Sequence, residues 1–378
     1  MPRANEGKHK SKGAPLPIVL ILQKFLKTYE KHCAQSQTSV CPAIKSDLKS
    51  SIDSDQVLRK FMLVRSDDSP PRILPVSLEP LLMTIQDECY TLAKEICIWG
   101  LPLSNPEIAR LALLLESKGH TTCPFTTLEI IDCKMDLWSL ERLGKALRFS
   151  SLRSLVLDYC KFGKEELESI FSGLENNQRL QGLSLRYCGL GPQSGLRLGS
   201  VISQSAICEL YLEGNYLECS GALAFLRPIA DFAETQGKDQ LTPGSPDAGH
   251  PPQRLQGIKK KMEGLMEAGP WLVKLHLADN GIDGKGKEGE NGLLEFLQTL
   301  TCLIKYSAHL REIDLGNNVL GEMAAAEILE ALRARKTGKL PVLKITVTPQ
   351  ISSDTFRSIW KNSKKSNTIR KKKKKTKN

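Results

Sequence analysis

One short pattern of apolar residues recurs along the sequence, and it limits the fold more than any other feature. In the stretch LRSLVLDYCKF at 152–162, apolar side chains stand at places one, four, six and eleven, and Cys160 stands at place nine. The alternation at places four and six predicts a short strand with one buried face. Because the pattern returns at a nearly fixed interval, it predicts a stack of similar coils. Six units match at all five places, beginning at Phe125, Leu152, Leu180, Ile207, Leu272 and Leu310.

The ninth place of each unit holds either Asn or Cys. The backbone groups that follow a strand lie inside such a stack and need hydrogen-bond partners there. An Asn amide supplies a donor and an acceptor, whereas Cys is a small, mostly apolar substitute with a weak donor. We expect a ladder of these side chains rather than a metal site, since no Cys-x-x-Cys spacing accompanies them. The ladder residues are Cys133, Cys160, Cys188, Asn215, Asn280 and Asn318.

The spacing of the units points to a known family. The first four units start at residues 125, 152, 180 and 207, so that they are 27 or 28 residues apart. Amphipathic helical patterns lie between strands at 136–149, 163–176 and 324–336. In this period and helix content, the segment 93–350 resembles the ribonuclease-inhibitor-like subfamily of leucine-rich-repeat proteins. The resemblance implies an α/β solenoid with a curved parallel β-sheet inside and helices outside.

The rest of the chain suggests three parts. We expect residues 1–90 to form a helical N-terminal extension, either a cap or a partner-binding element, with helices at 16–31 and 77–94. Residues 91–356 are assigned to the solenoid, whose outermost units at 96–103 and 340–348 match the pattern less well, as capping repeats do. Two insertions interrupt the period: a Gly- and Pro-rich loop at about 235–253, expected to be mobile, and a shorter one at 284–292.

The net charge of +11 comes from the C-terminal end alone. Residues 357–378 hold eleven Lys or Arg and no acid, which leaves 42 basic and 42 acidic residues in the preceding body. We expect this basic tail to be disordered. Its composition fits a nuclear-import signal, a contact with nucleic acid or another acidic polymer, or a solubilising end, and it does not separate the three.

Signals for membranes, secretion and catalysis are weak. No run of about 18 apolar residues predicts a transmembrane helix, and Gln23 and Lys24 interrupt the apolar stretch at 16–26 that could imitate a signal peptide. The G-x-G-x-x-G match at 284–289 lacks its βαβ context. We therefore expect no membrane contact, no enzyme activity, no catalytic site, no metal and no cofactor. The scattered cysteines favour a reducing compartment: the cytoplasm, with the nucleus and the cilium as alternatives.

The inner face of the predicted stack is the candidate binding surface. Residues between and just after the alternating leucines should point to the concave side, where nine acidic residues meet only two basic ones. Tyr159 and Tyr187 hold the same place in adjacent units and should be neighbours, with Tyr211 one coil on. The candidate partner-binding residues are Glu129, Asp132, Asp158, Tyr159, Arg186, Tyr187, Glu209, Tyr211, Glu213, Asp279, Glu312 and Asp314.

Our first hypothesis for function is a non-enzymatic scaffold or adaptor that binds a protein partner with a basic surface or segment on this face. A solvated face with no dedicated ligand is the plainer interpretation. Two alternatives come from other features: a nuclear, nucleic-acid-associated protein acting through the lysine-rich tail, and a regulator of a GTPase or hydrolase. The resemblance adds an axonemal or cytoskeletal scaffold.

Overall fold

A computed structural model describes residues 17–65, 74–116, 125–239, 271–286, 288–348 and 352–363. Nine parallel strands form one open sheet in which every strand pairs with its neighbours in chain order. The strands are β1 Lys60–Val64, β2 Glu95–Trp99, β3 Thr127–Ile131, β4 Ser154–Val156, β5 Gly182–Ser184, β6 Glu209–Tyr211, β7 Lys274–His276, β8 Glu312–Asp314 and β9 Lys344–Thr346.

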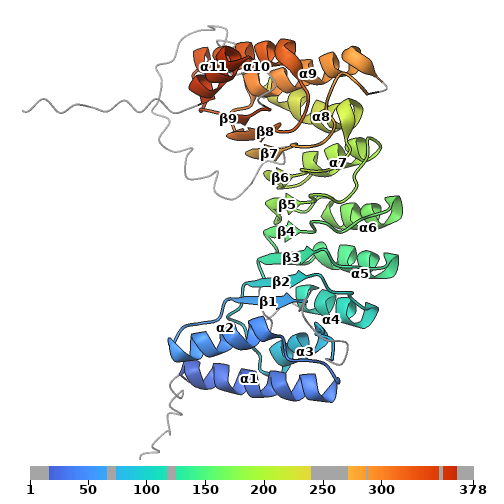
Figure 1. Ribbon diagram of the computed structural model, residues 1–378, viewed down its shortest axis with the longest axis vertical. Helices are drawn as coiled ribbons and strands as arrows, with labels where there is room; N and C mark the ends of the chain where they lie inside the picture. Colours follow the sequence, from blue (N-terminus) through green and yellow to red (C-terminus); the bar gives the residue numbers. More distant parts are fainter. Residues whose placement is uncertain are drawn as a thin grey trace, which may run out of the picture.

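Helices cover the opposite side of the coils, so that the strands line the inner side of an arc and the helices its outer side (Figure 1). This is the α/β leucine-rich-repeat solenoid that the repeat predicts. The described helices are α1 Ile18–Gln35, α2 Pro42–Asp53, α3 Glu79–Asp87, α4 Asn105–Glu116, α5 Leu137–Leu147, α6 Lys164–Leu174, α7 Ser194–Ser203, α8 Glu218–Asp239, α9 Gly289–Tyr306, α10 Gly321–Thr337 and α11 Ser353–Ser363.

The repeated leucines build one continuous core. Leu155 of β4 lies in register with Leu183 of β5, which lies in register with Leu210 of β6. All three side chains are fully buried between the sheet and the helices. A coil can bury its apolar face only against the coils beside it, so that stacking is what makes each repeat stable.

Asn215 shows how the ninth place joins one coil to the next. Its Oδ1 accepts hydrogen bonds from the backbone N–H groups of Cys188 and Leu190 at 3.1 and 3.0 Å. Its Nδ2 donates to the carbonyl oxygens of Leu185 and Leu212, both at 2.8 Å. The amide therefore satisfies four buried backbone groups, in agreement with the predicted ladder.

The cysteines at the ninth place make fewer bonds, and their thiols are weaker donors. The Cys160 thiol donates to the Ile130 carbonyl oxygen at 3.4 Å, and the Cys188 thiol donates to the Leu157 carbonyl oxygen at 3.0 Å. Burial raises the pKa of Cys160 to about 12, so that its sulfur stays protonated. A buried, neutral thiol of this kind is a structural residue rather than a reactive one.

The N-terminal segment contributes to the sheet before residue 91. Strand β1 pairs in parallel with β2, and α2 lies next to it. Helix α2 falls in the polar stretch at 35–56, where Ile44 and Leu48 are its buried residues. The predicted helix at 77–94 is shorter in the structure, because α3 ends at Asp87 and Cys89 takes a positive φ of 46°.

The C-terminal end is closed by α11, which packs on α10 and β9 and buries Ile359. Residues 357–363 of the predicted tail are therefore helical, while residues 364–378 lie outside the described part of the chain. The insertion predicted at 235–253 begins inside α8, which continues to Asp239, and its other residues also lie outside the described part.

Candidate functional site

The eighth residue of each coil turns the chain through the left-handed region of backbone space. Its φ lies between 51° and 69° at Gly100, Asp132, Tyr159, Tyr187, Gly214, Asp279 and Asn317. Gly, Asn and Asp tolerate this conformation, whereas for a bulky side chain it is an outlier. Tyr159 and Tyr187 are therefore the exceptions in this row, and each carries a strain of about 1–3 kcal/mol that the surrounding structure offsets.

The two strained tyrosines stack on one another. Their ring centroids are 4.8 Å apart and the rings are almost parallel, with an interplanar angle of 7°. Tyr159 is 51% exposed and Tyr187 is 41% exposed. The second face of the Tyr187 ring covers Gly214, where any Cβ would overlap the ring. The predicted neighbours thus form an exposed aromatic platform on the inner face.

Tyr211 belongs to a second cluster beside this platform. The Arg186 guanidinium lies over the Tyr211 ring, 4.8 Å from its centroid, and Nε of Arg186 donates to Oε2 of Glu213 at 3.0 Å. His276 packs edge-on against the same ring at 4.8 Å, with its Nδ1 2.9 Å from Oε1 of Glu213. Burial opposes ionisation of Glu213, but His276 and Arg186 together hold the pKa of that carboxyl below its usual range.

Several acids of the concave face have cationic partners within the protein. Lys274 reaches Glu209 at 2.9 Å, and Lys344 of β9 reaches Glu312 at 2.6 Å. The mostly buried Asp158 accepts bonds from the Ser184 hydroxyl and the Arg186 backbone N–H, at 2.6 and 3.0 Å. Burial outweighs these bonds and raises the pKa of Asp158. The face is therefore less negative than the sequence count indicates.

The remaining candidate acids differ in whether their carboxylates have hydrogen-bond partners. Glu129 accepts a bond from the Cys97 thiol at 2.9 Å, and Asp314 accepts one from the Gly316 backbone N–H at 2.8 Å. Asp132 and Asp279 are exposed, and within the described ranges their carboxylates have no hydrogen-bond or ion-pair partner. The sheet thus brings all twelve candidate residues to one face and, as far as the described part of the chain shows, leaves only the Asp132 and Asp279 carboxylates unpaired.

Sequence reasoning missed two lysines of this face, and it placed His276 on the face without counting it among the candidate site residues. Lys60 of β1 lies 3.9 Å from Glu95, Lys344 pairs with Glu312, and His276 contacts two carboxylates, since its Nε2 is also 3.6 Å from Glu312 Oε1. Both lysines fill the strand place that Glu209 fills in β6, and each lies beside a glutamate at that place in the adjacent strand. The place of Lys344 was readable from the unit at 340–348, whereas that of Lys60 needed β1 to be counted as a strand.

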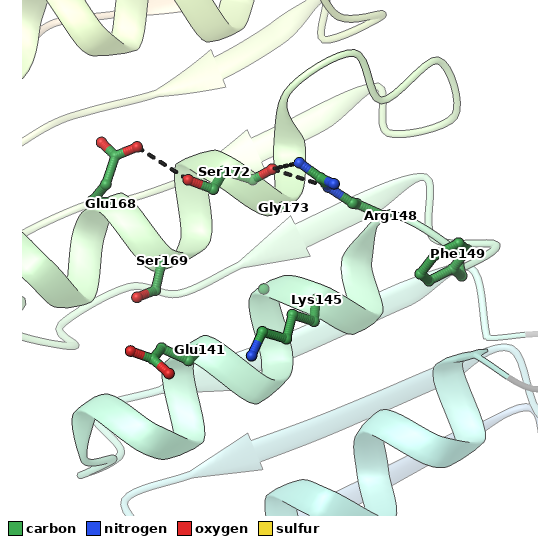
Figure 2. Close-up of a pocket in the computed structure, with 9 residues that line it drawn as sticks. Glu141, Lys145, Arg148, Phe149, Glu168, Ser169, Ser172 and Gly173 are labelled. Atoms are coloured by element: carbon green, nitrogen blue, oxygen red, sulfur yellow. Dashed lines mark hydrogen bonds between the residues drawn. The ribbon is translucent and has the colours of Figure 1, made fainter.

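A groove of about 420 Å³ lies on the outer side, between α5 and α6. Figure 2 shows Arg148 donating to the Ser172 carbonyl oxygen across it, while Glu141 and Lys145 line its α5 side. The helices approach closely here, because a Cβ on Gly144 or Gly173 would overlap the backbone of the other helix. None of the predicted site residues lines this groove.

None of the described helices combines the length and the apolar character needed to cross a membrane. Within the same residues, no group of three or more His, Cys, Asp or Glu side chains is placed to hold a metal ion.

A sheet of this topology with an amide and thiol ladder defines a leucine-rich-repeat protein, and residues 270–287 match a family model described as a leucine-rich repeat. The chain is similar to ribonuclease-inhibitor-like leucine-rich-repeat proteins.

Two relatives illustrate the similarity. This chain is 28% identical over 250 residues to NACHT, LRR and PYD domains-containing protein 12 of Mus musculus, and the aligned segment covers 58% of this chain and 22% of the relative. This chain is also 25% identical over 237 residues to the ribonuclease inhibitor of Sus scrofa, and that aligned segment covers 55% of this chain and 49% of the relative. The chain thus matches half or less of the length of these relatives.

Proposed function

We propose that this protein is a non-enzymatic scaffold that holds a basic segment of a protein partner against its concave face, centred on Tyr159 and Tyr187. The observation that carries the proposal is the exposed tyrosine stack on a strained backbone. Backbone strain and exposed aromatic area both oppose stability, so that a surface that keeps both is best explained by use. Aromatic side chains near the centre of a surface are also common binding hot spots.

The charge pattern supports a basic partner. Asp132 and Asp279 lie on the same face as the tyrosine pair, and their carboxylates have no partner among the residues that the structure describes. Carboxylates without an internal cation attract a positively charged segment and exclude an acidic one. Leucine-rich repeats offer a long concave surface for such a segment.

A regulator of a hydrolase is the second candidate, because one relative is by its name an inhibitor of ribonuclease. The two candidates share the concave face and differ in the partner. A turnover assay on a captured partner that proves to be an enzyme separates them.

Site-specific photo-crosslinking tests the proposal. A benzophenone side chain at Val156, in the centre of the face, should capture a partner that the same group at Trp138, on the exposed side of α5, does not capture. Replacing both tyrosines by Asn should lower the yield at Val156 at least tenfold, since central aromatic anchors often contribute about 2 kcal/mol or more.

Deletion of residues 364–378 is the control and should leave capture at Val156 intact. If the deletion abolishes capture while the tyrosine double variant captures normally, the tail is the functional element and the concave face is not.

A further inference from the structure

The stacked tyrosines lie between two acidic side chains in the row of eighth-place residues. Asp132 is one strand away from Tyr159, and Asp279 is two strands away from Tyr187. Both carboxylates are exposed, and neither meets a cation in the part of the chain that the structure describes. The other end of the row, at Asn317, is uncharged.

Only one ring face of the pair is open. Tyr187 is covered by Tyr159 on one face and covers Gly214 with the other. The order of the strands turns the second face of Tyr159 toward Asp132. That face stacks on no other ring and holds no cation among the described residues. An aromatic face next to a free carboxylate is therefore available to a ligand.

The same surface already holds one guanidinium in such a setting. Arg186 lies over the Tyr211 ring while its Nε bonds to Glu213. A planar cation suits this pairing, since it stacks on the ring and still presents N–H groups to a carboxylate, which a lysine ammonium cannot do. Tyr159 with Asp132 repeats the aromatic and acidic halves of this arrangement and lacks only the cation.

We propose, as a refinement that rests on the function proposed above, that the partner segment inserts an arginine between Asp132 and the open face of Tyr159. A second basic residue of the same segment pairs with Asp279. Four strand steps of about 4.8 Å separate the two carboxylates along the sheet, which an extended chain at about 3.3 Å per residue spans in about six residues. The partner motif is thus an extended segment with two basic residues about six positions apart, the first being arginine.

Synthetic peptides test the chemistry without knowledge of the partner. The probe is a fluorescent Gly/Ser peptide with two arginines six positions apart, and binding to the full-length protein is measured by anisotropy at low and at physiological salt. Lysine at the first position keeps the charge and removes the plane, whereas citrulline keeps the plane and removes the charge. We expect each replacement to weaken binding at least about fivefold.

Variants of the protein assign the two contacts. Asp132→Asn should weaken the binding of the arginine and lysine peptides and leave the binding of the citrulline peptide unchanged. Tyr159→Asn should bring the arginine peptide down to the affinity of the lysine peptide. Asp279→Asn should weaken the binding of a peptide whose two arginines are six positions apart and should not change the binding of a peptide in which they are three positions apart. Glu330→Gln, on the outer surface of α10, is the matched control and should change nothing.

The proposal is overturned if the arginine and lysine peptides bind equally, if Asp132→Asn is silent, or if the arginine peptide fails to bind even in the millimolar range. Those results leave the proposed function standing when crosslinking at Val156 still depends on the two tyrosines. Loss of that dependence removes both proposals.

Discussion

The ring of Tyr187 lies flat over Gly214, where the next coil has no side chain. Gly214 also has a φ of 69°, a conformation that an L side chain rarely adopts. Gly214→Ala should therefore displace the Tyr187 ring and break its stack on Tyr159. We expect a loss of about 1–3 kcal/mol in unfolding free energy, measured by urea denaturation, with weaker partner capture. Gly189→Ala, where φ is also positive but no atom lies close, separates backbone strain from ring displacement.

Replacing Tyr159 by Asn should leave stability nearly unchanged. Asn tolerates a φ of 59°, as Asn317 shows in the same place of another coil, so that relief of strain offsets the lost stack, which is worth about 0.5–1.5 kcal/mol. Tyr159→Val should instead cost about 2 kcal/mol or more, since a β-branched residue loses the stack and keeps the strain. Equal melting temperatures for the two variants would remove the strain argument.

Asn215→Ala should cost about 1–3 kcal/mol or more, because three buried backbone groups lose their partner, while the Leu212 carbonyl oxygen keeps its bond from Asn280. Cys160→Ala should cost less, since its thiol donates only a long bond to Ile130. Thermal denaturation of both variants measures the difference. An Asn215 variant that melts with the wild type would contradict the ladder.

Glu107 should make the N-terminal half sensitive to acid. Its carboxylate accepts bonds from the Ser77 hydroxyl and Leu78 N–H, and from the Ser104 N–H and hydroxyl, all at 2.7–2.8 Å. Burial alone would raise the pKa of Glu107, but these bonds together lower it. The stabilisation is therefore present above the unfolded pKa of about 4.3 and is lost as pH falls through the lower folded value.

The Glu107→Gln variant isolates this contribution. It should be less stable than the wild type at pH 7 by about 1–3 kcal/mol, because an amide replaces a carboxylate among four donors. The gap should begin to shrink below the unfolded pKa of about 4.3 and close once the pH lies below the lower folded pKa, where the wild-type carboxyl is protonated in both states. A gap that stays constant from pH 7 to pH 3 would show that charge is not involved.

Arg335 is buried, and its partners among the described residues are carbonyl oxygens, namely those of Ile304, Ser307, Leu310 and Pro341 at 2.7–2.9 Å. Arg335→Met keeps the apolar stem but removes the donor to these four carbonyl oxygens, of which only that of Leu310 has a second donor, from Arg311, among the described residues. We therefore expect a loss of about 2–5 kcal/mol in chemical denaturation. Arg333→Met, on the exposed side of the same helix, should be nearly neutral. Similar losses for the two would mean that charge on α10, and not the carbonyl bonds, matters.

The repeat predicted the solenoid because its five places specify a buried strand and a ladder residue, which leave few other folds. Strand β1 escaped notice although Leu58, Phe61 and Leu63 fill places one, four and six, because its ninth place is Ser66. Helix α2 was missed because its short apolar stripe rests on Ile44 and Leu48 amid serines.

The concave site was predictable in position but not in charge state. Strand alternation places Glu209 and Glu312 on the inner face, yet whether each meets a lysine depends on register with neighbouring coils and on rotamers. The left-handed backbone conformation of Tyr159 could not be predicted either, because the repeat pattern constrains the apolar places and the ninth place but not the eighth.

The ladder changes from thiols to amides between Cys188 and Asn215, and this change divides the molecule mechanically. Each coil touches only its neighbours, so that resistance to peeling is set link by link. Under tension the thiol-linked coils would separate before the amide-linked ones. The tyrosine pair belongs to the softer half and Asp279 to the stiffer half. A segment bound from Asp132 to Asp279 would cross the boundary between the thiol-linked and the amide-linked coils. A bound partner would therefore stiffen the arc across that boundary.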